Sequence, residues 1–193
     1  MSSVKKFKLS IDFNAPVILG FVAICFGALL LNNMTNGWTN RMLFSVYRSS
    51  MKSPFFYLRT IGHIFGHADW SHFANNMMYI LILGPILEEK YGSKTMGAMI
   101  ALTGFVTGVV SLVFFPANAL LGASGVVFAF ILLASVTSVK REGIPLTFLL
   151  VAAIYIGGQI WDGLTIRDNV SNLTHIIGGV VGATCGFLLN KKK

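Results

Sequence analysis

Apolar residues are gathered into six stretches that approach or reach the length of about 20 residues with which a helix crosses a membrane. They cover roughly residues 15–32, 72–87, 95–115, 120–139, 144–161 and 172–189. Only the first connection, residues 33–71, is long, and short connections make consecutive helices antiparallel. The pattern predicts an all-α polytopic membrane protein, a compact bundle of six transmembrane helices with a long, membrane-associated first loop.

This pattern leaves room for one domain. We expect residues 1–14 to form a short cytoplasmic tail, residues 15–190 the membrane domain, and residues 191–193 a basic cytoplasmic tail. The lysines that precede the first stretch are also typical of a signal peptide, but the region around Cys25 is a poor cleavage site. The first stretch is therefore expected to be a retained helix.

Composition supports a membrane protein, with 54% hydrophobic residues, 11% charged residues and a mean hydropathy of +0.72. These values exclude an ordinary soluble domain. In a soluble protein the net charge of +8 would suggest nucleic acid, but here it indicates orientation, and no nucleic-acid partner is expected. Cys25 and Cys185 lie in separate spans, so no disulfide framework is expected.

The basic residues indicate which side of the membrane each loop faces. With six spans and a cytosolic N-terminus, ten of the 15 basic residues lie on the cytosolic side. The other five are Arg41, Arg48, Lys52, Arg59 and Arg167. This bias agrees with the positive-inside rule and predicts that both termini are cytoplasmic. The first loop mixes these cations with aromatic residues, so we expect short helices lying partly in the outer leaflet.

Ser124 lies in the sequence Gly122-Ala123-Ser124-Gly125, at the start of an apolar stretch. Flanking glycines let the backbone adopt unusual conformations, and a helix that opens at serine leaves N–H groups free to stabilise an oxyanion. The same tetrapeptide is also compatible with close helix packing and no chemistry. By itself it is a weak signal.

His175 lies inside another apolar stretch, followed by Gly178 and Gly182 on the same helical face. A glycine face permits close approach to a neighbouring helix, where the imidazole could take the proton of a serine hydroxyl. A purely structural histidine is the alternative. Since no acidic residue lies in the spans, catalysis would use a Ser-His dyad.

His72 and Asn76 are four residues apart at the start of the second span and share a helical face. Both can donate hydrogen bonds to a tetrahedral intermediate, although His72 could instead tie the first loop to the helix. His63 and His67 are also four apart, but no glutamate follows the first, as a zinc protease would require. We therefore expect no metal and no cofactor.

Two charged residues are expected to be architectural. Arg59 has a fork of donors that can hold carbonyls of the first loop. Glu88, at the inner end of the second span, can tie the neighbouring connection together.

The order of these motifs resembles the rhomboid intramembrane serine proteases, from Arg59 to Gly182. The sequence shows, in order, Arg59, His67, His72-x-x-x-Asn76, Glu88 with Tyr91-Gly92-Ser93, Gly122-Ala123-Ser124-Gly125, and His175-x-x-Gly178-x-x-x-Gly182. The resemblance, to the bacterial six-span type, implies Ser124 as nucleophile and His175 as general base and acid. It further implies that His72, Asn76 and the Ser124 N–H form the oxyanion site, which Gly122 helps to shape. Gly178 and Gly182 would pack the sixth span against the fourth.

Three positions depart from the family pattern. The family's Trp-Arg pair is Leu58-Arg59, Phe128 replaces a tyrosine whose ring contacts the histidine, and Thr174 replaces an alanine. We expect the ring contact to survive without the hydroxyl and Thr174 to compete for a hydrogen bond with His175. Asn172 matches a polar position of the family.

The sequence thus predicts a serine endopeptidase of a bacterial cell membrane that cleaves transmembrane helices of membrane proteins near the outer leaflet. The substrate is expected to enter between the second and fifth spans and unwind before attack, under a mobile cap formed by residues 162–171. Its partners would be such substrates and the lipid bilayer. A small transporter with a histidine-lined polar path and a non-catalytic binder of transmembrane helices remain alternatives, and the sequence does not indicate the oligomeric state.

Overall fold

The computed structural model describes residues 12–137, 144–165 and 169–190, and within them almost all regular structure is helical. The long helices are α1 (Pro16–Met34), α3 (Trp70–Tyr91), α4 (Ser93–Phe114), α5 (Ser124–Val136), α6 (Leu146–Thr165) and α7 (Asn169–Asn190). Between α1 and α3 lie three short helices, η1 (Asn40–Phe44), α2 (Pro54–Gly62) and η2 (His63–Phe65). The all-α class and the short helices of the first loop are confirmed.

A helix occupies each of the six predicted apolar stretches. In the described residues, three of these helices are long and apolar enough to cross a membrane: Pro16–Met34, Ser93–Phe114 and the Asn172–Asn190 part of α7. The apolar helices Ser124–Val136 and Leu146–Trp161 are shorter. The protein is therefore a multi-pass membrane protein, in which three helices are candidate spans by length and composition.

Helix ends follow local chemistry. Proline is among the first residues of α1 and α2, where its missing N–H has no helical partner to lose. The Asp69 carboxylate accepts from the His72 N–H at 2.8 Å and caps α3. Gly92, at φ 83°, separates α3 from α4.

Helix α5 starts at Ser124, as expected for a helix that opens at this serine, and Gly122 before it has a φ of 127° that no helix accepts. One predicted boundary was wrong: the connection expected over residues 162–171 is helical at both ends, since α6 continues to Thr165 and α7 starts at Asn169. The role of this segment as a mobile cap stays a prediction. Residues 1–11 of the expected N-terminal tail, the expected C-terminal tail, and the basic residues Lys140, Arg141 and Arg167 lie outside the described residues.

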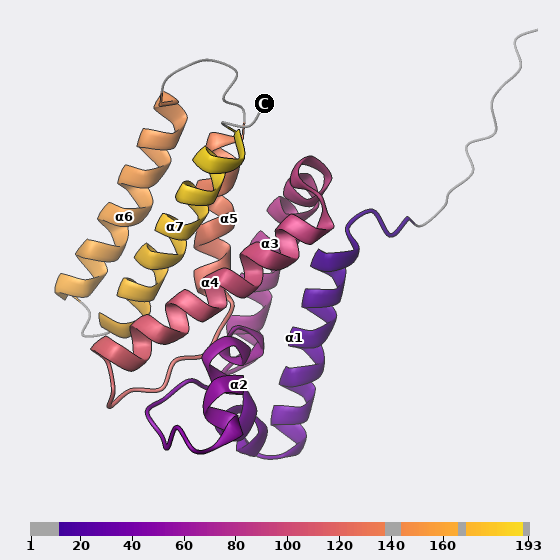
Figure 1. Ribbon diagram of the computed structural model, residues 1–193, viewed down its shortest axis with the longest axis vertical. Coiled ribbons are helices and arrows are strands. Elements are labelled where there is room, and N and C mark those ends of the chain that lie inside the picture. The colour runs from indigo at the N-terminus through magenta and orange to yellow at the C-terminus, as the bar shows by residue number, and fades with distance from the viewer. Residues whose placement is uncertain (1–11, 138–143, 166–168, 191–193) are drawn as a thin grey trace, which may run out of the picture.

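Helix α5 lies in the middle of the bundle, with α6 and α7 on one side and α3 on the other (Figure 1). Its closest neighbour is α7, because Gly178 faces the backbone of Gly125 and Gly182 faces that of Ala129. A Cβ atom at Gly182 would lie 2.6 Å from the Cα of Ala129, so only glycine allows this approach. The two helices that carry Ser124 and His175 are thereby locked together.

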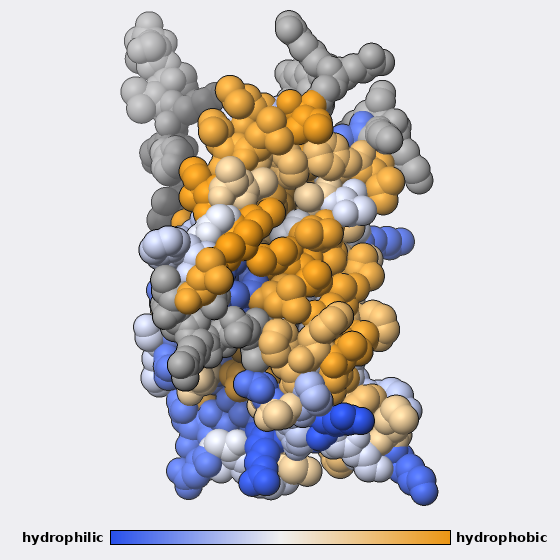
Figure 2. Space-filling view, turned by 90° about the vertical axis from the view of Figure 1, so that its left-hand side faces the viewer, coloured by the Kyte–Doolittle hydropathy of each residue, from blue (hydrophilic) through white to orange (hydrophobic). Residues whose placement is uncertain are grey.

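Apolar side chains also cover the outside of the bundle. Figure 2 shows a broad apolar surface on the side where α6 lies, and hydrophilic residues at the end formed by the first loop. Exposed large hydrophobic residues of α6 are Leu146, Leu149, Leu150, Ile154, Ile160, Trp161 and Leu164. Helices that are apolar both inside and outside the bundle are typical of a protein surrounded by lipid.

Glu88 joins three helices at the end of α3. Its carboxylate accepts from the backbone N–H of Val17 at 3.1 Å and of Ile18 at 3.0 Å, and from the Ser93 hydroxyl at 2.6 Å. The bond to Ser93 is the expected link to the neighbouring connection. The cap on the N-terminus of α1, where a negative charge is favourable, could not be read from the sequence.

Candidate active site

Ser124 and His175 form a hydrogen-bonded pair between two helices. Ser124 is the first residue of α5 and His175 lies in the second turn of α7. The His175 Nε2 atom lies 2.8 Å from the Ser124 Oγ atom, which is the distance a proton transfer between them requires. Both side chains are partly buried, so the pair lies inside the bundle.

The segment before Ser124 is held by the first loop. The backbones of Val46 and Leu120 exchange two hydrogen bonds of 2.9 Å, and the Gly122 N–H donates to the His63 carbonyl at 2.9 Å. These bonds hold the backbone of residues 120–122, just before the nucleophile. They therefore fix the orientation of the free N–H groups in the first turn of α5.

His72, Asn76 and Gly122 meet beside the start of α5. A Cβ atom at Gly122 would lie 2.8 Å from the His72 ring and 3.9 Å from the Asn76 amide nitrogen. That amide nitrogen, Nδ2, is buried without a hydrogen-bond partner. A buried donor without an acceptor is costly, and an oxyanion at this position would satisfy it.

An aromatic stack backs the imidazole of His175. The Phe128 ring lies parallel to it, with centroids 4.5 Å apart and planes 10° apart, so the ring contact exists without the tyrosine hydroxyl. On the far side, the Tyr155 ring of α6 contacts Phe128 edge-on at 5.4 Å.

Thr174 is buried, and its expected competition for a hydrogen bond with His175 stays a prediction. Asn172 lies two residues earlier in α7, and its Nδ2 atom is buried without a partner.

The sequence analysis missed Gln159. Its Oε1 atom lies 2.7 Å from the Nδ1 atom of His175, on the side of the ring opposite Ser124. An acidic side chain is not required to orient the imidazole, because an amide oxygen also accepts a hydrogen bond. A polar residue inside the apolar α6 was the available signal.

His63 and His67 are buried in the first loop and serve its packing. Burial disfavours the charged imidazole and lowers the pKa of both residues to about 4. His63 Nε2 lies 3.2 Å from the Thr107 hydroxyl, and the His67 ring contacts that of His72 edge-on at 5.1 Å. In the described part of the chain, histidine, cysteine, aspartate and glutamate form no group of three that could hold a metal.

Arg59 lies in α2, within the first connection, and is buried, 4% exposed. Its guanidinium donates to the Tyr47 hydroxyl at 2.9 Å and to the Ser49 hydroxyl, and lies 4.2 Å from the centroid of the Tyr47 ring. The expected carbonyl partners are therefore replaced by hydroxyls and an aromatic face. The role remains architectural, because these contacts fold the loop onto α2.

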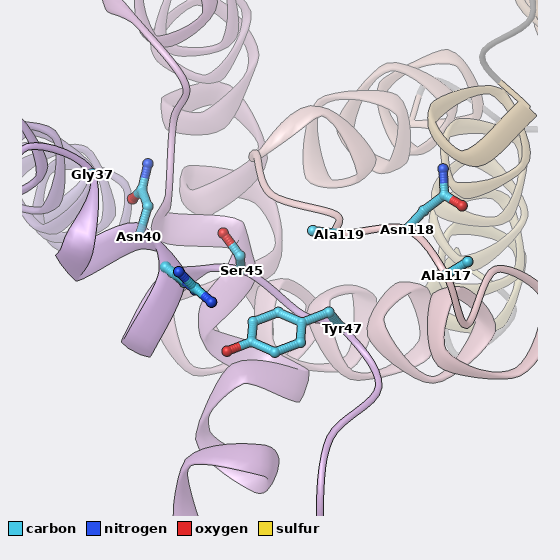
Figure 3. A pocket seen from close by; sticks show the side chains of 8 residues that line it. Gly37, Asn40, Ser45, Tyr47, Ala117, Asn118 and Ala119 are labelled. Atoms are coloured by element: carbon cyan, nitrogen blue, oxygen red, sulfur yellow. The ribbon is translucent and has the colours of Figure 1, made fainter.

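A pocket of about 470 Å³ lies between the first loop and the segment that precedes α5. Figure 3 shows Ser45 and Tyr47 on one side and Ala117, Asn118 and Ala119 on the other. Neither Ser124 nor His175 lines it. The candidate active site is thus identified by its hydrogen bonds and not by a cavity.

Comparison with known proteins shows the family of this chain. The Rhomboid domain family matches residues 54–192, which include the Ser-His pair, the His72–Asn76 pair and the α7 glycines. The chain belongs to the rhomboid family. The first helix of this rhomboid-family protein, α1, precedes the matched region.

Several curated relatives are similar to this rhomboid-family protein. "Rhomboid-like protein 11, chloroplastic" of Arabidopsis thaliana is 26% identical over 142 residues, which cover 66% of this chain and 50% of the relative. "Rhomboid-related protein 2" of Mus musculus is 30% identical over 142 residues, or 67% of this chain and 47% of the relative. This rhomboid-family protein spans about half the length of these two relatives.

Proposed function

We propose that this protein is an intramembrane serine endopeptidase that cleaves transmembrane segments of membrane proteins near the outer leaflet. The observation that carries the proposal is the 2.8 Å contact between Ser124 Oγ and His175 Nε2 on two helices held together by glycines. Serine is a weak nucleophile unless a base removes its proton, and the imidazole is in place to do so.

The reaction begins when Ser124 Oγ attacks the scissile carbonyl carbon while His175 Nε2 takes the hydroxyl proton. The carbonyl oxygen becomes an oxyanion, for which the Asn76 amide, the His72 ring and the Ser124 N–H are the donors. His175 then gives its proton to the leaving amine, and the acyl group stays on Ser124. Water, deprotonated by His175, attacks the ester carbon, the bond to Ser124 Oγ breaks as His175 returns the proton to that oxygen, and the acid is released.

The apolar outer side of α6 supports a lateral route for the substrate. In the described residues α6 packs against α5 and α7, and its other side carries exposed apolar side chains. A substrate helix would enter from the lipid between α3 and α6. It must unwind at the scissile bond, because the carbonyls of an intact helix are already hydrogen-bonded. Small residues and helix breakers in the substrate therefore favour cleavage.

The proposal includes a topology of six membrane spans with both termini in the cytoplasm of a bacterial cell. Helices occupy all six apolar stretches, and the basic residues are biased toward the cytosolic side. Reporter fusions at both ends test this topology. An external reporter at either end would contradict it.

Cleavage of a model transmembrane substrate by the purified protein in liposomes tests the activity. Wild type is expected to cut within or near the spanning segment, and Ser124→Ala and His175→Ala each to lose at least about a thousandfold of the rate. Ser135→Ala is the matched control, since Ser135 also lies in α5 and bonds only to the Leu132 carbonyl in the described contacts. If wild type cuts no substrate and a fluorophosphonate fails to label Ser124, the protein is a non-catalytic binder or a transporter.

A further inference from the structure

We infer that Gln159 is a positioning residue that fixes the protonation state and orientation of His175. The inference rests on the proposed protease function but concerns a residue outside the Ser-His pair. The amide oxygen of Gln159 lies 2.7 Å from His175 Nδ1 and the serine hydroxyl lies 2.8 Å from Nε2. The three side chains, from α6, α7 and α5, thus form one chain of hydrogen bonds.

The direction of these bonds decides whether the imidazole can act. A neutral imidazole carries one proton, on either Nδ1 or Nε2. An acceptor at Nδ1 holds the proton there, and Nε2 keeps the lone pair that receives the proton of Ser124. Without that acceptor, the ring can protonate Nε2 instead, and the nucleophile then has no base.

A neutral amide suits this position better than a carboxylate. Gln159 lies in the apolar Leu146–Trp161 part of α6, which exposes Ile154, Ile160 and Trp161 on its outer side. A carboxylate at membrane depth carries a large desolvation penalty, whereas an amide oxygen accepts the same hydrogen bond at a smaller one. The Gln159 amide can therefore orient the imidazole although the six apolar stretches contain no acidic residue.

The same face of α6 also contacts the aromatic ring that stacks on the imidazole. Tyr155 precedes Gln159 by four residues and therefore shares its helical face, and its ring contacts Phe128, which stacks on His175. The imidazole is thereby oriented by α6 in its plane through Gln159 and on its face through the aromatic stack.

Substitutions of equal length separate the acceptor from the volume of the side chain. Gln159→Met removes the acceptor and is expected to lower kcat and the rate of fluorophosphonate labelling of Ser124 by about tenfold to a hundredfold, because the lost bond is made to an imidazole that becomes charged in the transition state. KM should change by less than about twofold, since Gln159 contacts His175 and not the substrate. Gln159→Glu keeps an oxygen acceptor, because a carboxyl in its neutral form still accepts through its carbonyl oxygen without the penalty of a buried charge, and it should retain activity within about fivefold of wild type. Ile160→Met, on the same helix, is the control.

A spectroscopic measurement separates this inference from the activity. In ¹⁵N-histidine NMR, with His175 assigned by its loss in His175→Ala, wild type should carry the neutral-ring proton on Nδ1 and Gln159→Met should show both tautomers. If wild type shows the Nδ1 proton but neither cleaves nor reacts with the probe, the protease function fails and the positioning role stands. Three results would overturn the role of Gln159. Gln159→Met could label as fast as wild type, or Gln159→Met and Gln159→Glu could lose the same fraction of activity. The third is a neutral-ring proton on Nε2 of His175 in the wild-type protein.

Discussion

Replacing Gly178 with alanine should separate the Ser-His pair without touching either residue. A Cβ atom at Gly178 would contact the Gly125 carbonyl oxygen and lie 2.9 Å from the Gly125 Cα and carbonyl carbon. Carbon atoms pack best at about 3.5–4.0 Å, so α7 must move away from α5 by about 0.6–1 Å. The obstacle is backbone on both helices, and no side-chain rotation relieves it.

The displacement falls within one turn of the reacting atoms, since Gly125 follows Ser124 and Gly178 is three residues after His175. Added to the present 2.8 Å, it takes the Oγ–Nε2 distance beyond the limit of about 3.2 Å for a good hydrogen bond. We expect Gly178→Ala to lower the labelling rate of Ser124 on the order of a hundredfold. Overpacking should also lower the free energy of unfolding by about 1–3 kcal/mol.

Gly179→Ala is the matched control on the same helix. Its Cβ atom would lie 3.5 Å from the Leu132 side chain, an ordinary contact, and alanine favours a helix over glycine by about 1 kcal/mol. This variant should keep the wild-type labelling rate and unfold at the same or a higher temperature. Labelling and thermal unfolding of Gly178→Ala that both match Gly179→Ala would refute the argument that the α5–α7 contact sets the active geometry.

Three further predictions concern single contacts. Phe128→Leu removes the stack on His175 and should lower kcat about threefold to tenfold, measured on a transmembrane substrate, and an unchanged kcat would count against the stack. Glu88→Gln should lower the free energy of unfolding by about 1–3 kcal/mol because it weakens three hydrogen bonds. Glu89 is exposed, so Glu89→Gln should leave this free energy unchanged in a denaturant titration. Equal effects of the two substitutions would contradict the cap on α1. Burial holds the pKa of His63 at about 4 instead of 6.5, so its contribution to stability is complete above pH 6.5 and is lost as the pH falls toward 4. Because the pKa of His67 is lowered to the same value, denaturant unfolding should show a loss of about 2 kcal/mol for each of the two histidines at pH 5 relative to pH 7, and equal stability at the two pH values would contradict this effect of burial.

Much of the candidate site could be predicted from single residues and short spacings. Glycines three and seven residues after His175 share its helical face in any α-helix, so their close contact with a neighbour follows from local geometry. Gly122 has a positive φ and no space for a Cβ atom, which is what a glycine before a helix start suggests. The resemblance to rhomboid proteins added the pairing of these segments.

Contacts between distant segments could not be predicted in the same way. Arg59 was expected to hold carbonyls, but it bonds to hydroxyls of Tyr47 and Ser49, because the path of a loop decides which acceptors come within reach. The bounds of the connection over residues 162–171 were also mispredicted, because backbone hydrogen bonding continues α6 and α7 past their apolar stretches.

The sequence by itself determined the membrane setting, the all-helical class and the residues capable of chemistry, because hydrophobicity and helical periodicity are local properties. Only the tertiary structure decided that Gln159 faces His175. That contact depends on how α6 is rotated and how far it is shifted along α7, and both are set by packing among helices. The sequence shows Gln159 as a polar residue in an apolar stretch, and only its contact with His175 across the α6–α7 interface indicates a role.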